Sequence, residues 1–138
     1  MQSDGAFAPE SADEARELYE SVGPAAQVVV RETATAMEFD REEYRERVTG
    51  EVVETARDAL FASLLVVHDG TNEEFEAWAD DYAEYEVETL GSENVDNVVW
   101  HVIPFADRVL AATYQNEPEA AAGTLRRQAF GRVYRELF

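Results

Sequence analysis

The chain has 138 residues, of which 46% are hydrophobic, so it is long enough to bury a core of its own. Its longest apolar run, residues 59–67, is about half as long as a membrane-spanning helix needs to be. The absence of cysteine excludes disulfides, thiolate metal sites and cysteine nucleophiles. The first residues carry neither a basic nor an apolar segment, so we expect no signal peptide and a cytoplasmic location.

Thirty acidic residues against eleven basic ones give a net charge of −19, and every basic residue is arginine. Heat adaptation enriches lysine as well as glutamate, so it does not explain this composition. Concentrated salt does explain it, because at 1 M the Debye length falls to about 3 Å and a large net charge is tolerated. We therefore expect a halophile protein with hydrated K⁺ and Na⁺ at its surface. The alternative is a partner for basic proteins or a mimic of nucleic acid.

Capping residues and helical spacing predict helices over the first 82 residues. After an irregular lead over residues 1–10, Ser11 caps a first helix that ends at Gly23. A second helix, over about 24–38, gathers apolar side chains on one side. These side chains are Ala25, Val28, Val29 and Ala36.

The strongest helix start is the capping box over residues 40–43, and helical spacing continues from it to Val67. Gly50 can bend or split this third helix, because a glycine inside a helix costs about 1 kcal/mol. His68 follows its end, where an imidazole can bond the last carbonyls. A further capping box over residues 71–74 predicts a fourth helix.

After the fourth helix the apolar period changes from about four to two. Residues 86–90 alternate weakly, and residues 98–105 and 108–115 predict two strands of a hairpin. The first long strand is apolar on both faces, so the sheet must be covered on both sides, by helices or by a second subunit. Asn116 is the expected cap of a last helix.

These elements predict a single α+β domain over residues 1–138. It should consist of about four N-terminal helices, a small antiparallel β-sheet of two or three strands, and a C-terminal helix packed on the sheet.

His101, in the first long strand, is the candidate catalytic residue because the pKa of histidine lies near neutrality. A core or interface histidine is the interpretation we favour, since the surrounding strand is apolar and no carboxylate is close in sequence. No phosphate-binding loop, nucleophile elbow or metal motif is present. We therefore expect no cofactor and no metal site.

Polar side chains flank the predicted hairpin and meet at one end of the sheet if its two strands pair. They are Asn94, Asn97, Tyr114, Gln115 and Asn116. The functional interpretation is that these side chains form a polar binding site. The structural interpretation is that they only stabilise turns and cap helices. We favour the structural interpretation.

The last sixteen residues hold the chain's one concentration of basic side chains. These are Arg126, Arg127, Arg132 and Arg135. Arginine clusters bind phosphate, so anion or RNA binding is a third possibility. Pairing with acidic neighbours is the simpler explanation, because concentrated salt removes most of the counterion-release gain, and we do not expect nucleic-acid binding.

Five segments resemble a family of small uncharacterised proteins from haloarchaea. They are residues 39–44, 51–60, 91–97, 115–120 and 125–131, and the resemblance covers nearly the full length. It implies a habitat and no activity, so no functional residue is carried over from it.

Without a catalytic constellation, the leading hypothesis is a non-catalytic interaction or structural module, either a homo-oligomer or bound to another protein. The doubly apolar strand is its motivation. The alternative is a small-molecule-binding protein or enzyme that uses the polar end of the sheet.

Overall fold

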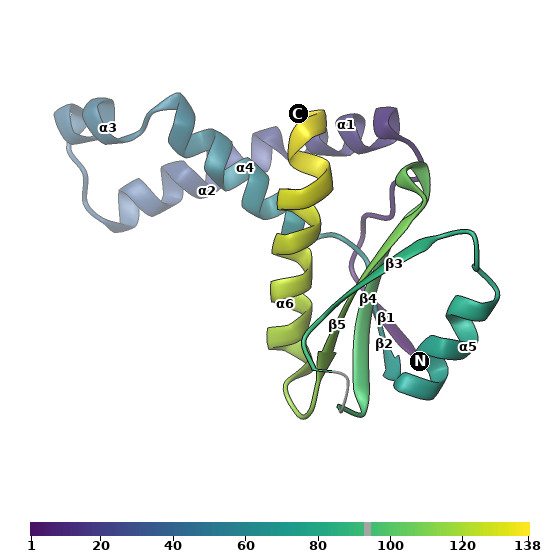
Figure 1. Cartoon of the computed structure of the whole chain (residues 1–138). Coiled ribbons are helices and arrows are strands. Elements are labelled where there is room, and N and C mark those ends of the chain that lie inside the picture. Colours follow the sequence, from purple (N-terminus) through teal and green to yellow (C-terminus); the bar gives the residue numbers. More distant parts are fainter. Residues whose placement is uncertain (93–94) are drawn as a thin grey trace.

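The computed structural model describes residues 1–92 and 95–138 (Figure 1). In chain order the elements are β1 (Gln2–Asp4), α1 (Ala12–Ser21), α2 (Gly23–Ala36), α3 (Arg41–Arg47), α4 (Gly50–Ser63), β2 (Val67–Thr71), α5 (Asn72–Asp80), β3 (Glu86–Leu90), β4 (Asn97–Ile103), β5 (Arg108–Tyr114) and α6 (Pro118–Ala129). A short 3₁₀ turn, η1 (Pro104–Ala106), joins β4 to β5. After α6 the chain continues helically through the π-turn η2 (Phe130–Tyr134) and the 3₁₀ turn η3 (Arg135–Leu137).

The α+β class and the hairpin of β4 and β5 are confirmed, but the sheet is larger than expected. Its order is β1-β2-β4-β5-β3. The strands pair antiparallel except for β3, which runs parallel to β5 at the edge. A parallel neighbour requires a crossover connection, which is a tertiary feature that hairpin patterns do not reveal. The prediction of a two- or three-stranded antiparallel sheet was therefore wrong in strand number and, for β3 alone, in direction.

The N-terminal lead is more ordered than expected. Its residues Gln2–Asp4 form β1 by pairing with β2, although all three side chains are exposed. Gly5 follows in a left-handed conformation (φ 120°), and a Cβ there would lie 2.5 Å from the carbonyl oxygen of Leu65. Glycine lets the lead pass this close to the chain after α4, so the strand depends on tertiary contacts rather than on its own pattern.

The predicted third helix is split, and its end is a strand. Thr49 accepts a hydrogen bond from the Val52 amide and caps α4, so the break falls just before Gly50. The helix ends at Ser63, and Val67 begins β2. Extending the helix to Val67 was wrong, because β-branched Val67 pairs with Asp4 of β1 and begins β2 instead.

Two of the predicted helix caps do not form. His68 lies in β2 and does not cap a helix. The last helix starts at Pro118, and no side chain caps it, so Asn116 is not its cap. Proline at a first helical position has no N–H group that needs a cap. The cap of α1 by Ser11 and the capping box of Thr71 and Glu74 are confirmed.

Both faces of the β4–β5 pair are covered within one chain, as Figure 1 shows with α6 on one side of the sheet and α5 on the other. The α6 side holds the main core, to which α1 and α4 also contribute. It includes Phe61, Val99, Ile103, Leu110, Leu125 and Tyr134. On the α5 side, Val98, Trp100 and Ala111 pack against Phe75 and Trp78. The sheet therefore gives no reason of its own to expect a second subunit.

Three helices project from this body as an arm, formed by α2, α3 and α4 (Figure 1). Within the arm α2 packs along α4, and its buried residues are Ala26, Val30 and Ala34. The small helix α3 at the tip buries no residue. The arm is thus held together mainly by one narrow contact between two helices.

Candidate functional site

His101 lies in β4 and is only 1% exposed. Its Nδ1 is 2.6 Å from the carbonyl oxygen of Val66, and its Nε2 is 2.7 Å from the hydroxyl of Tyr134. A carbonyl can only accept, so Nδ1 carries the proton and donates to Val66, and Nε2 accepts from the Tyr134 hydroxyl. The imidazole therefore ties β4 to the chain just before β2 and to the end of the C-terminal helix.

Burial lowers the pKa of the His101 imidazole to about 4, so the ring is neutral at physiological pH. Both nitrogens already have partners, and the side chain is closed off from the surface. The geometry supports a structural role and offers no substrate a way to either nitrogen.

The polar end of the sheet brings together four of the five predicted residues. Asn97 and Tyr114 lie directly opposite each other in β4 and β5, and the Asn97 amide donates to the carbonyl of Gln115 at 3.2 Å. Gln115 and Asn116 are exposed and, with Tyr114, line a shallow hollow of about 330 Å³ beside the start of α6. Asn94 lies outside the described residues.

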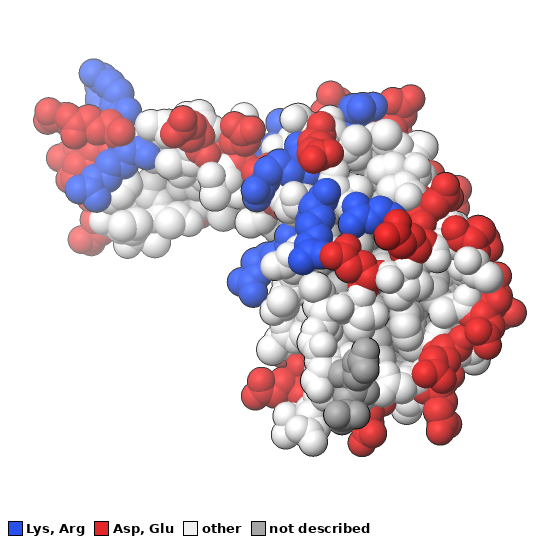
Figure 2. Space-filling view, in the orientation of Figure 1, with Lys and Arg blue, Asp and Glu red and all other residues white. Residues whose placement is uncertain are grey.

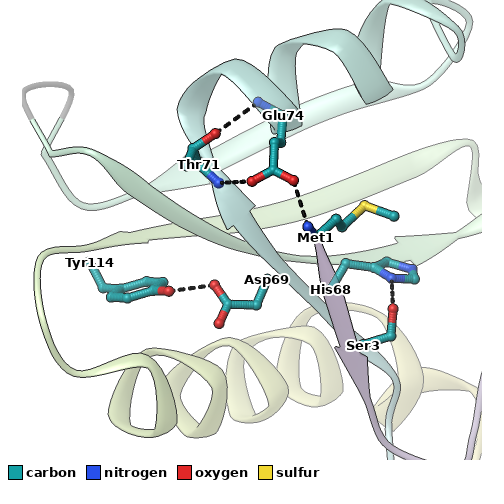
Figure 3. Close-up of polar contacts among 7 residues, drawn as sticks. All are labelled: Met1, Ser3, His68, Asp69, Thr71, Glu74 and Tyr114. Carbon is teal, nitrogen blue, oxygen red and sulfur yellow. Dashed lines mark hydrogen bonds and ion pairs between the residues drawn. The ribbon is translucent and has the colours of Figure 1, made fainter.

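A larger cleft, of about 510 Å³, lies next to this end between β1, β2 and α6. Asp69 of β2 lines it and accepts a hydrogen bond from the Tyr114 hydroxyl (Figure 3). Burial and this carboxylate raise the pKa of Tyr114 to about 12, so the hydroxyl remains a donor. Arg126 also lines the cleft. Its guanidinium donates to the carbonyl of Leu65 at 2.8 Å and to the carbonyl and carboxylate of Asp4 at 3.2 and 3.4 Å.

Sequence reasoning missed Asp69, because it placed this residue just beyond a helix. The signal that could have found it is the β-branched pair of residues 66 and 67, which starts a strand. Side chains alternate along a strand, so Asp69 and His68 lie on opposite faces of the sheet. Asp69 lies on the face that α6 covers.

The four C-terminal arginines do not converge on one site. Arg126 pairs with Asp4, and Arg132 pairs with Glu88 of β3. Arg127 contacts the hydroxyl of Thr124 at 3.5 Å, and the Arg135 guanidinium lies 5.4 Å from the centre of the Phe130 ring. Two of these cations are thus already bound to carboxylates, which disfavours a common anion site.

On the other face of the edge strand, the Ser3 hydroxyl lies 2.7 Å from Nδ1 of His68 (Figure 3). Burial lowers the pKa of His68, so its imidazole is neutral, as a general base requires. In the described part of the chain, however, no side chain forms a hydrogen bond with its other ring nitrogen. The pair fastens β1 to β2 rather than forming a reactive site.

Glu74 connects the same edge to α5 (Figure 3). It closes the capping box with the Thr71 amide at 3.1 Å, and its other oxygen is 2.5 Å from the amino group of Met1. The hydrogen bond from that amino group is the largest influence on Glu74 and lowers the pKa of its carboxyl. These contacts are structural.

The apolar side of α2 that the sequence indicates is exposed. Val28 and Val29 are each 45% exposed, and Ala25 and Ala36 are exposed as well. The contact with α4 uses the opposite side, through Ala26, Val30 and Ala34. We call the exposed group, Ala25, Val28, Val29 and Ala36, the α2 face.

The surroundings of the α2 face are almost uncharged. Residues 22–37 carry one arginine and one glutamate, in a chain whose residues are 30% charged. In Figure 2 most of the lower flank of the arm, where α2 lies, shows no charged side chain, whereas the tip carries many. The arm thus presents an exposed apolar helix side with few charges around it.

Among the described residues no group of three or more histidines and carboxylates is placed to hold a metal ion. No helix in the described part of the chain is both long enough and apolar enough to cross a membrane.

The fold defines the class, an α+β protein with a mixed sheet and a helical arm. Its sequence matches a protein-family model over residues 6–135. The chain belongs to that family, which is described as a family of unknown function (DUF5809). No curated protein and no solved structure matches the chain. The predicted membership in an uncharacterised family is confirmed, and the family description assigns no activity.

Proposed function

We propose that this protein is a non-catalytic interaction module that contacts a protein partner through the α2 face. The observation that carries the proposal is the exposure of Val28 and Val29, at 45% each, on a helix whose other side is buried. An apolar stripe on each of two opposite sides of a helix is expected when the helix packs on both sides.

Two further properties support an interaction role. The best candidate for a catalytic base, His101, has both nitrogens occupied in the core. The arm projects from the body, which makes α2 accessible to another molecule (Figure 1). Because both faces of the sheet are covered by helices of the same chain, the argument for a protein partner now depends on the α2 face and not on the sheet.

The composition supports the remaining part of the proposal, a cytoplasmic protein of a halophile. A net charge of −19 without lysine fits concentrated intracellular salt, in which hydrated K⁺ and Na⁺ screen the surface. Growth and handling in such salt are therefore part of every experiment below.

A photo-crosslinking amino acid in place of Val28 tests the interaction in cells that make the protein naturally. We expect a crosslinked protein product from position 28. The control places the same amino acid at Glu76, an exposed residue of α5 on the acidic side of the body. Absence of any product specific to position 28 would overturn the proposed function.

A second candidate function is small-molecule binding in the 510 Å³ cleft, which is favoured by Asp69 held in place by Tyr114. The cleft lies at the polar end of the sheet, and its size is within the range of ligand pockets. Nuclear magnetic resonance with a panel of small charged metabolites tests it. Shifts confined to the cleft and abolished by Asp69→Asn would support binding, and no shifts would reject it.

A further inference from the structure

We infer that the partner on the α2 face is a second copy of this chain, bound about a two-fold axis with the two α2 helices antiparallel. This inference rests on the proposed function and names its partner. Its basis is the charge pattern of α2, in which the acidic Glu32 and the basic Arg31 are neighbours in the second half of the helix.

Helical geometry places Glu32 within the α2 face. At about 100° per residue, positions 25, 28, 29, 32 and 36 lie within roughly 100° of arc, on the side away from the α4 contact. Arg31 borders the same stripe. Both charged residues are exposed, and neither takes part in an ion pair of the described residues.

A two-fold interface requires a surface that complements itself, since residue i contacts j and j contacts i. Antiparallel α2 helices satisfy this condition, because Arg31 of each copy can reach Glu32 of the other across the axis. The valines then face the second half of the opposing helix, where Thr33 and Ala36 are small. One helix surface thus supplies both the apolar contact and two reciprocal ion pairs.

Net charge explains why two copies would meet here rather than elsewhere. Each copy carries a charge of −19, so most approaches bring carboxylates together. Residues 22–37 are neutral overall, with one arginine and one glutamate. A basic partner would be attracted to the acidic surfaces instead, which favours a second copy as the occupant of this neutral stripe.

The size of the surface sets the expected strength. A helix of 14 residues is about 21 Å long, so an α2–α2 contact lies at the small end of specific interfaces. We therefore expect a reversible dimer that dissociates on dilution. It should strengthen with salt, because salt screens the repulsion between the two copies while leaving the apolar contact intact.

Sedimentation equilibrium of the full chain in concentrated KCl, over a wide range of protein concentration, tests the inference. We expect the wild type to move from monomer to dimer and Val28→Glu to remain monomeric. Arg31→Glu should weaken the dimer by a few fold, since two exposed ion pairs become repulsive and concentrated salt reduces the size of both effects. Arg45→Glu on α3 makes the same change in net charge, and we expect it to dimerise as the wild type does.

The charge swap is the decisive variant. Arg31→Glu combined with Glu32→Arg restores the reciprocal pairs and should recover dimerisation, which no loss of folding could imitate. A wild type that is monomeric throughout, while position 28 crosslinks to a different protein, would overturn this inference and leave the proposed function standing. A dimer that is unaffected by Val28→Glu would overturn it as well.

Discussion

The body of this molecule buries its apolar side chains, whereas the arm leaves some of its apolar side chains exposed. In the body, the doubly apolar strand β4 is covered by helices of the same chain, and Trp100 and Ile103 on its two faces are fully buried. In the arm, α2 has one side on α4, while Val28 and Val29 on the other side remain exposed. The body covers its own apolar strand, whereas the arm leaves one apolar side of a helix exposed.

This difference shows that a sequence pattern can predict an apolar surface but cannot predict what packs against that surface. In sequence, the apolar side of α2 looks like the two apolar faces of β4. Chain length and connectivity let α5 and α6 reach the sheet, whereas α2 packs mainly along α4 and makes a smaller contact with α1. Equivalent substitutions in the two regions should therefore differ in their effects.

The largest effect is expected from Phe61→Ala in the body. Phe61 is fully buried, and its ring contacts those of Tyr19, Phe130 and Tyr134 at centroid distances of 5.9, 6.0 and 5.3 Å. Truncating such a side chain leaves a cavity and should lower the free energy of unfolding by about 3–5 kcal/mol. Denaturant unfolding in concentrated salt measures the change. A loss below about 1 kcal/mol would mean that the core of the body is not as tightly packed as the structure shows.

The second effect is a pH dependence from His101. The pKa of its imidazole is about 4 in the folded protein and 6.5 for the unperturbed group, so the unfolded chain binds the extra proton first as pH falls. The contribution of neutral His101 is complete above pH 6.5 and declines toward pH 4, by about 3 kcal/mol in total. Unfolding free energies measured between pH 4 and 7 should show this decline in the wild type. His101→Gln, which keeps a polar side chain but cannot titrate, should lack it, and equal slopes in both proteins would refute the assignment.

Sequence reasoning succeeded where the signal is local. The capping residues Ser11 and Thr71, and the hairpin of residues 98–105 and 108–115, were found because caps and alternation depend on near neighbours. It failed where pairing decides the outcome. β1 has three exposed residues and no pattern, and the direction of β3 depends on a crossover.

The candidate sites divide in the same way. The proximity of Asn97 to Tyr114 follows from the hairpin register and was predictable. The contact of Tyr114 with Asp69 was not, because it requires β2 to lie beside β4. The apolar side of α2 was visible in the sequence, but its exposure was not, since exposure depends on which helices the chain can bring to it.

Two glycines give a contrast of intermediate size. Gly91 in the body has φ 97°, and a Cβ there would lie 2.4 Å from the Thr113 hydroxyl, so Gly91→Ala should cost about 1–3 kcal/mol. Gly123 lies inside α6 with open space around it, so Gly123→Ala should stabilise by about 0.5–1 kcal/mol. Thermal unfolding of the two variants should show shifts of opposite sign. Shifts of the same sign would contradict the described backbone at one of these positions.

The smallest effect on folding is expected from the α2 face itself. Val28→Gln with Val29→Gln replaces two apolar side chains that are each 45% exposed, so the unfolding free energy of the monomer should change by less than about 0.5 kcal/mol. The same pair of changes removes the apolar part of the proposed contact and should abolish association. Unfolding of dilute protein and sedimentation of concentrated protein separate these two quantities. A large loss of monomer stability would mean that these valines already pack within their own chain, and then the arm, like the body, would be complete without a partner.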